Sequence, residues 1–125
     1  TVRKRFREIV ENVGQAMGCD TEIEIVRATY PVDNDPMLAD LMADVVRKIQ
    51  VDADVNRAYQ TMGSEDFSYM TQDLPGCYML VGSANAEKGL NYGHHHPCFN
   101  IDETCLPYAV AVMAQGAVET LKKLN

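Results

Sequence analysis

The stretch PVDNDPMLADLMADVVRKI, residues 31–49, joins a turn-rich segment to a strongly amphipathic pattern. Asn34 or Asp35 can cap a helix in which Pro36 takes the first position, where a missing N–H does no harm. The apolar residues that follow share one broad stripe of the kind that packs on a sheet: Met37, Leu38, Leu41, Met42, Val45, Val46 and Ile49. The stretch therefore predicts a turn, a capped start and a core-facing helix.

We take the turn-rich segment as a boundary between residues 1–30 and residues 31–125, because both prolines interrupt the pattern there. On the amino-terminal side, apolar residues recur at spacings of three and four and predict a helix that ends near Gly18: Val2, Phe6, Ile9, Val10, Val13 and Met17. The next segment, TEIEIVRATY at 21–30, alternates polar and apolar residues, which predicts a strand with one wet face.

The carboxyl-terminal side continues the alternation of helices and strands. Residues 55–60 predict a short strand, and the apolar run at 77–81 predicts a strand covered on both faces. Between them, Ser64 can cap a short helix. A final helix runs to about Leu124. The order of elements predicts the α/β fold class.

The size and charge of the chain exclude several classes of partner. A chain of 125 residues with 46% apolar residues suffices for one core of moderate extent. Its net charge is −7, and no cluster of Lys and Arg forms a stripe, so we expect no nucleic-acid partner. No apolar run reaches the roughly 20 residues that cross a bilayer, so we expect no membrane partner.

The cysteines indicate the cellular compartment of the protein, and the first residues indicate whether the chain is part of a longer one. With so much apolar content, a disulfide framework is unnecessary, so we interpret the four cysteines as reduced thiols of a cytoplasmic protein: Cys19, Cys77, Cys98 and Cys105. The sequence starts without Met and enters a helix at once. We therefore expect a fragment of a longer protein.

The stretch YGHHHPCFNIDE, residues 92–103, contains every histidine of the chain. Neutral imidazole is the commonest nitrogen ligand of zinc and related ions. Adjacent residues of an extended segment point to opposite sides, so at most one or two of the three can bind one ion. The alternative is that one histidine hydrogen-bonds the backbone while the others are solvated. The remaining candidate ligands, none at a recognised ligand spacing from the histidines, are Cys98, Glu65, Asp66 and Glu103.

The stretch MGSEDF, residues 62–67, is the second concentration of polar side chains. Two adjacent carboxylates at a helix start can simply favour the positive end of the helix dipole. The alternative places Glu65 in the wall of a pocket shared with the histidines. Spacing alone leaves both interpretations open.

Together, MGSEDFSYM and HHHPCFNIDE resemble two linked motifs of the metal-dependent amidohydrolases in the zinc aminoacylase and carboxypeptidase family. Hippurate hydrolase, N-acyl amino acid deacylase and the auxin-conjugate hydrolases belong to it. The resemblance covers nearly the whole chain. It implies that residues 31–125 are the carboxyl-terminal part of a twisted-sheet, zinc-peptidase-like catalytic domain. Residues 1–30 would be the last helix and strand of an inserted α+β lid domain, through which the enzyme forms a homodimer.

The same resemblance assigns roles to individual residues. His95 matches the metal-binding histidine of the motif H-x-P-x-F, and His96, in its variable position, would line the rim of the substrate site. Gly63, Ser64 and Glu65 lie on a segment that approaches the substrate. The resemblance implies two divalent metal ions, which are zinc, manganese, cobalt or nickel. It transfers no catalytic residue to this chain, because the general base and the other ligands have no matching positions.

The implied reaction is cleavage of the amide bond of N-acyl amino acids by attack of metal-bound water. We expect the fragment alone to be inactive. Two alternatives belong to other classes of protein. One is a stand-alone module that holds zinc, nickel or copper through the histidines, and the other is an interaction module that self-associates through an exposed sheet edge.

Overall fold

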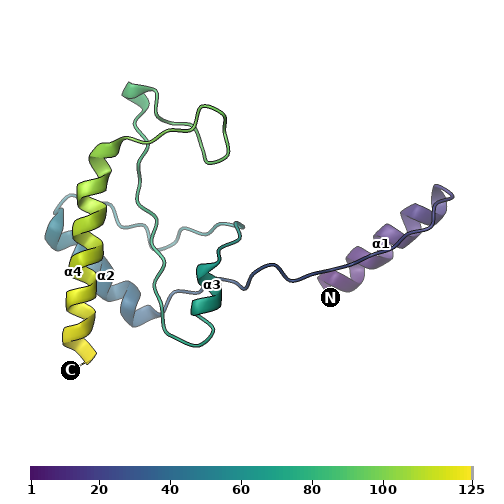
Figure 1. Cartoon of the computed structure of the whole chain (residues 1–125), viewed down its shortest axis with the longest axis horizontal. Coiled ribbons are helices and arrows are strands. Elements are labelled where there is room, and N and C mark those ends of the chain that lie inside the picture. The colour runs from purple at the N-terminus through teal and green to yellow at the C-terminus, as the bar shows by residue number, and fades with distance from the viewer. Residues whose placement is uncertain (125) are drawn as a thin grey trace.

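The computed structural model of the chain describes residues 1–124 and divides them into an arm and a body (Figure 1). The arm consists of α1 (Val2–Ala16) and the segment that runs back along it. The body holds the remaining elements, which are α2 (Pro36–Ile49), α3 (Phe67–Met70), the 3₁₀ turns η1 (Ala86–Lys88) and η2 (Glu103–Cys105), and α4 (Leu106–Leu124). An extended linker joins the two parts (Figure 1).

The helices agree with the patterns that predicted them. Asp35 is the cap of α2, since its carboxylate accepts a hydrogen bond from the Leu38 N–H at 2.9 Å, and Pro36 takes the first position. The end of α1 is followed by Gly18 with a φ of +69°, a left-handed conformation that suits glycine. α3 begins at Phe67, two residues after Glu65, and its cap residue Asp66 makes no side-chain bond to the helix. The prediction that Ser64 caps this helix was therefore wrong.

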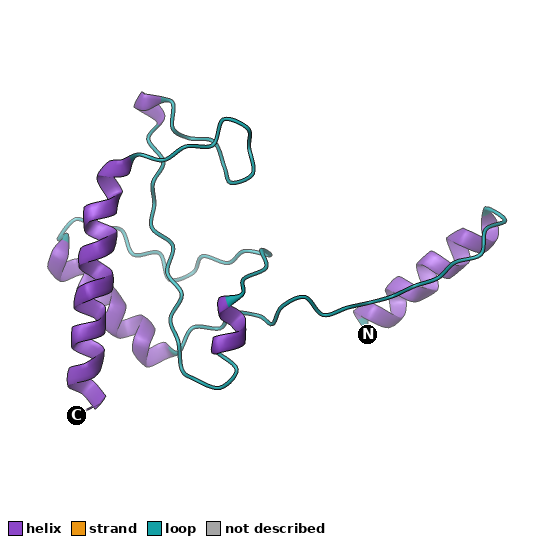
Figure 2. Ribbon diagram, viewed as in Figure 1, coloured by secondary structure: helices purple, strands orange, loops and turns teal. Residues whose placement is uncertain are grey.

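None of the three predicted strands has a partner strand among the described residues (Figure 2), and the backbone of 55–60 bends at Arg57 and Ala58. Within residues 1–124 the only ladder contact is an isolated bridge between Asn85 and Leu90. A strand exists only where a neighbouring strand accepts its N–H groups, and the described residues supply no neighbour for 21–30, 55–60 or 77–81. The run at 77–81 is also not covered on both faces, since Leu80 and Val81 are about half exposed. The α/β class, the twisted sheet and the boundary at residue 31 remain predictions.

The core of the body lies where α2 and α4 pack together. Leu41, Val45 and Val112 are its buried residues, and four further side chains pack against them: Met42, Val46, Ile49 and Met79. Gly116 allows this close approach, because a Cβ at that position would lie 2.5 Å from the Met42 sulfur. The α2–α4 pair is thus the framework to which the loops of the body attach.

Side-chain hydrogen bonds replace sheet pairing in the body. The Asn34 amide donates to the Tyr78 carbonyl at 2.9 Å and accepts from the Tyr78 N–H at 2.8 Å, as a backbone neighbour in a ladder would. Ser68, which is fully buried, accepts from the Tyr30 N–H at 3.1 Å. Tyr69 donates its hydroxyl to the Ala28 carbonyl at 2.7 Å. These contacts hold the start of α2, the segment before it and α3 together.

No helix among the described residues combines the length and the apolar character that crossing a lipid bilayer requires.

Candidate functional site

The histidine loop, residues 92–99, is an exposed loop folded on itself. Its backbone turns twice, since the His96 N–H donates to the Gly93 carbonyl at 3.2 Å and the Phe99 N–H donates to the His96 carbonyl at 2.9 Å. The three histidines of these turns make different contacts. The loop can therefore present one imidazole separately from the other two.

Two of the three histidines hold the loop together. The His94 ring packs edge-on against Phe99, with ring centres 4.9 Å apart. His96 stacks on Tyr92 at 4.2 Å, and its Nδ1 accepts a hydrogen bond from the Cys98 N–H at 3.0 Å. This last bond matches the expectation that one histidine bonds the backbone. Neither ring is free to rotate without losing a contact.

His95 differs from its neighbours in backbone and in contacts. Its φ is +67°, in the left-handed region that non-glycine residues occupy at a cost of roughly 1–3 kcal/mol. Within the part of the chain that the structure describes, its ring has no hydrogen bond and no ring contact, and the residue is exposed. Strained backbone conformations that surrounding contacts maintain are typical of functional sites. His95 is thus the histidine with both ring nitrogens available.

The donor chemistry of the loop fits one ligand of a divalent metal ion. Imidazole nitrogen suits zinc and nickel, and an exposed ring without a partner can orient toward an ion. Within residues 1–124, however, no three His, Cys, Asp or Glu side chains come together as a metal site would require. The described residues therefore supply His95 and not a complete set. Its role as a ligand stays a prediction.

Apart from His96, the residues expected near the substrate lie on the segment before α3. Glu65 is half-buried, and a hydrogen bond between its carboxylate and the Tyr78 hydroxyl raises the pKa of that phenol. Gly63 donates its N–H to the Thr61 hydroxyl at 3.3 Å, whereas Ser64 is exposed. Within the described range, no hydrogen bond or ion pair joins this segment to the histidine loop. The structure thus fixes Glu65 without bringing it to His95.

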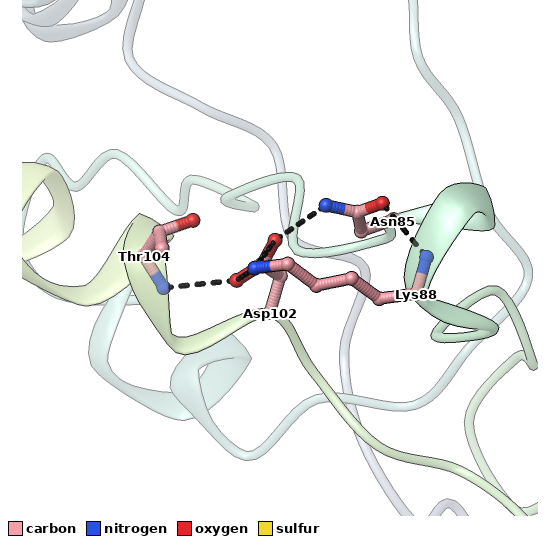
Figure 3. A network of polar contacts seen from close by, with 4 residues as sticks. All are labelled: Asn85, Lys88, Asp102 and Thr104. Atoms are coloured by element: carbon pink, nitrogen blue, oxygen red, sulfur yellow. Dashed lines mark hydrogen bonds and ion pairs between the residues drawn. The ribbon is translucent and has the colours of Figure 1, made fainter.

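The neck of the histidine loop, which we define as residues 83–90 and 102–104, contains functional candidates that the sequence patterns did not predict (Figure 3). Asp102 is buried, and its carboxylate binds the side chains of Asn85 and Lys88 and the Thr104 N–H. These hydrogen bonds hold the pKa of the Asp102 carboxyl well below its usual range. The available signal was the acidic residue within NIDE, directly before the final helix.

One known protein family matches most of the chain, including the histidine loop. Residues 6–119 match the model of the peptidase family M20/M25/M40. The chain is 34% identical over 112 residues to an N-acetyldiaminopimelate deacetylase of Streptococcus sanguinis, which covers 86% of this chain and 27% of that protein. It is 29% identical over 126 residues to IAA-amino acid hydrolase ILR1-like 2 of Arabidopsis thaliana, covering 98% of this chain and 28% of the relative.

A third relative is thermostable carboxypeptidase 2 of Saccharolobus solfataricus, at 29% identity over 119 residues, which covers 94% of this chain and 30% of the relative. No solved structure matches the chain. The chain spans between a quarter and a third of the length of these three curated relatives, all of which bear the names of hydrolases. Because the family model covers nearly the whole sequence, and both predicted motifs lie inside it, the chain belongs to the peptidase family M20/M25/M40.

Proposed function

We propose that the complete protein hydrolyses the amide bond of N-acyl amino acids with two divalent metal ions, and that His95 is a ligand of one of them. The observation that carries the proposal is the contrast within the histidine loop. His94 and His96 are engaged by Phe99 and Tyr92, whereas the His95 ring has no partner among residues 1–124. The relatives' names, a deacetylase and an amino acid hydrolase, support the choice of substrate class.

This chain contributes one metal ligand and part of the substrate pocket. The remaining metal ligands come from elsewhere in the complete protein. A divalent ion at such a site lowers the pKa of a bound water and polarises the carbonyl of the bond to be cleaved. The metal is zinc, manganese, cobalt or nickel, and among these imidazole nitrogen suits zinc and nickel. His95 holds its ring away from its neighbours through its left-handed backbone, which limits the reorganisation that binding requires.

The substrate side of the proposed site consists of Gly63, Ser64, Glu65 and His96. Glu65 is oriented by the Tyr78 hydroxyl, and His96 by its stacking on Tyr92. A positioned carboxylate and a positioned imidazole can receive the polar groups of an acylated amino acid. Ser64, whose hydroxyl is exposed, can exchange water for a substrate oxygen at little cost.

Assembly is part of the same proposal. We assign residues 1–30 to a lid domain through which two copies of the complete protein associate, and residues 31–125 to the catalytic domain. The apolar face of α1, which is half or more exposed at Val2, Phe6 and Ile9, supports a role in packing against further chain. The cytoplasmic location remains a prediction.

The test is replacement of His95 by Ala in the complete protein. We expect kcat/KM on N-acyl amino acids to fall by more than the roughly 10–100-fold that loss of an outer-shell partner causes. Metal content should fall by about one ion per chain, because a zinc-type site with three protein ligands loses one of them.

His94→Phe is the matched control, because it removes an imidazole from the same loop and keeps the aromatic packing on Phe99. It should retain metal and most activity. Equal losses in the two variants, or a fully active His95→Ala protein, would reject the assignment.

A further inference from the structure

We infer that Asp102 is a positioning residue, whose carboxylate closes the neck of the loop that carries His95 and fastens that neck to α4. The neck itself is described by contacts within this chain. Its consequence for metal binding rests on the proposed function of His95.

The neck brings together two segments that are distant in sequence. The Asn85 amide donates to Asp102 Oδ2 at 2.6 Å, and the Lys88 ammonium lies 3.0 Å from each carboxylate oxygen (Figure 3). The Asp102 N–H donates to the Ser83 carbonyl at 2.8 Å. Asn85 also accepts from the Lys88 N–H at 3.2 Å, which orients both partners. Both oxygens of one buried carboxylate therefore join the entrance and exit of the loop.

The same carboxylate fastens the neck to the helical framework. Asp102 Oδ1 accepts from the Thr104 N–H at 3.2 Å and so caps η2, which continues directly into α4. α4 packs on α2 through the core residue Val112. A displacement of Asp102 would therefore move the loop relative to the framework.

Among the described residues, the histidine loop is attached to the rest of the chain only through its neck, which also includes the paired backbone hydrogen bonds between Asn85 and Leu90. The hydrogen bonds and ring contacts of residues 92–99 are all internal to that segment. They fix the shape of the loop but not its place relative to the rest of the chain. That place depends on the neck, where Asp102 receives charge-assisted hydrogen bonds, which are the strong kind. Asp102 thus determines where His95 lies without touching it.

The alternative is that Lys88 and Asp102 form an ordinary surface ion pair of little consequence. The chain offers a matched comparison in α4, where Lys122 and Glu119 lie at the same distance, 3.0 Å. The Asp102 side chain is 12% exposed and the Glu119 side chain 26%. The Lys122–Glu119 pair also joins residues of one helix three positions apart, so it fixes no loop.

The experiment compares three variants of the complete protein with the metal removed and then restored: Asp102→Asn, Lys88→Met and, as the control, Lys122→Met. Amide hydrogen exchange of residues 90–101 measures closure of the neck. Titration with Zn²⁺ measures metal affinity. Thermal unfolding measures overall stability. Lys88→Arg serves as the conservative variant, because a guanidinium can bind both carboxylate oxygens.

We expect Asp102→Asn and Lys88→Met to speed exchange of residues 90–101 at least about tenfold and to weaken Zn²⁺ binding by about tenfold, the lower end of the effect of outer-shell partners. Lys88→Arg should restore both quantities, and Lys122→Met should change neither. Unchanged exchange in folded Asp102→Asn and Lys88→Met proteins would overturn the inference, as would equal changes in Lys122→Met. If the neck opens but His95→Ala retains its metal, the positioning of the loop stands and the proposed ligand fails.

Discussion

The arm and the body contain helices of similar length with equally clear apolar faces, yet they bury different amounts of them. In α2 the face is covered, since Leu41 and Val45 are buried against α4. In α1 the only buried residue is Gly14, and the apolar face is half or more exposed at four positions: Val2, Phe6, Ile9 and Val13. An amphipathic pattern therefore predicts which face of a helix packs against other residues. It does not predict whether those residues belong to the same chain.

The two regions also differ in how their segments are fastened. In the body, side chains bridge distant segments, as Asn34 does to Tyr78 across 44 residues. In the arm, one hydrogen bond of 3.2 Å, from the Arg7 guanidinium to the Ile23 carbonyl, joins α1 to the returning segment. Gly14 also approaches Thr21 closely, since a Cβ at Gly14 would overlap the Thr21 methyl group. We therefore expect mutations to have larger effects in the body than in the arm.

The largest effect should come from the core of the body. Leu41→Ala should lower the free energy of unfolding by about 2–5 kcal/mol, because it removes buried methyl groups and leaves a cavity beside Val45 and Val112. Ile9→Ala, in the arm, should cost less than about 1 kcal/mol, because Ile9 is already 50% exposed. Urea titration of the 125-residue chain, followed by far-UV circular dichroism, measures both. Similar losses at the two positions would abolish the distinction between arm and body.

A smaller effect, of either sign, should come from Gly14 in the arm. Alanine is preferred to glycine in a helix interior by about 1 kcal/mol, but a Cβ at Gly14 would overlap the Thr21 methyl group. We expect Gly14→Ala to destabilise α1 when residue 21 is Thr and to stabilise it by up to about 1 kcal/mol together with Thr21→Ser. Exchange of the α1 amides in the four members of this cycle gives the coupling. Equal effects in both backgrounds would show that α1 does not press on residue 21.

The sequence predicted the helices well, because their signals are local. Asp35 and Pro36 mark the start of α2 within two residues, and the apolar stripe of the final helix predicted its extent to Leu124. The strands have no such local signal, because a strand depends on a neighbouring strand from any part of a protein. The segments 21–30 and 77–81 have β-like patterns and no partner within the described residues.

The candidate site also contains one residue that the sequence predicted, His95, and one that it did not, Asp102. A family motif distinguished His95 from the other two histidines. The structure adds a physical distinction, because His95 is the one of the three whose ring has no partner among the described residues. Asp102 escaped sequence reasoning because its partners Asn85 and Lys88 lie 17 and 14 residues away. Nothing in the local pattern links one aspartate to an amide and an amine across a loop. Such a network becomes visible only when the fold brings its members together.

The smallest expected effect is a dependence on pH. It compares the Lys88–Asp102 ion pair of the body with the Arg5–Glu8 ion pair of the arm. The folded-state pKa of Asp102 is lowered from an ordinary value of 3.8, chiefly by hydrogen bonds from Asn85 and Lys88. The ionised Asp102 carboxylate therefore contributes fully to closure of the neck when the pH is above the ordinary pKa. That contribution is lost as the pH falls through the lowered pKa. Protection of residues 90–101, corrected for intrinsic exchange, should stay constant from about pH 8 to about pH 5 and fall only in strongly acidic solution.

Asp102→Asn should abolish this acid transition, since it removes the titrating group. Glu8→Gln is the control in the arm. It breaks the ion pair of Glu8 with Arg5, 3.1 Å apart and exposed on both sides, and should leave exchange in both regions unchanged because solvent screens such a pair. A loss of protection between pH 7 and pH 5 would contradict the role of Asp102 at the neck, because its carboxylate, with a pKa lowered from 3.8, stays ionised throughout that range.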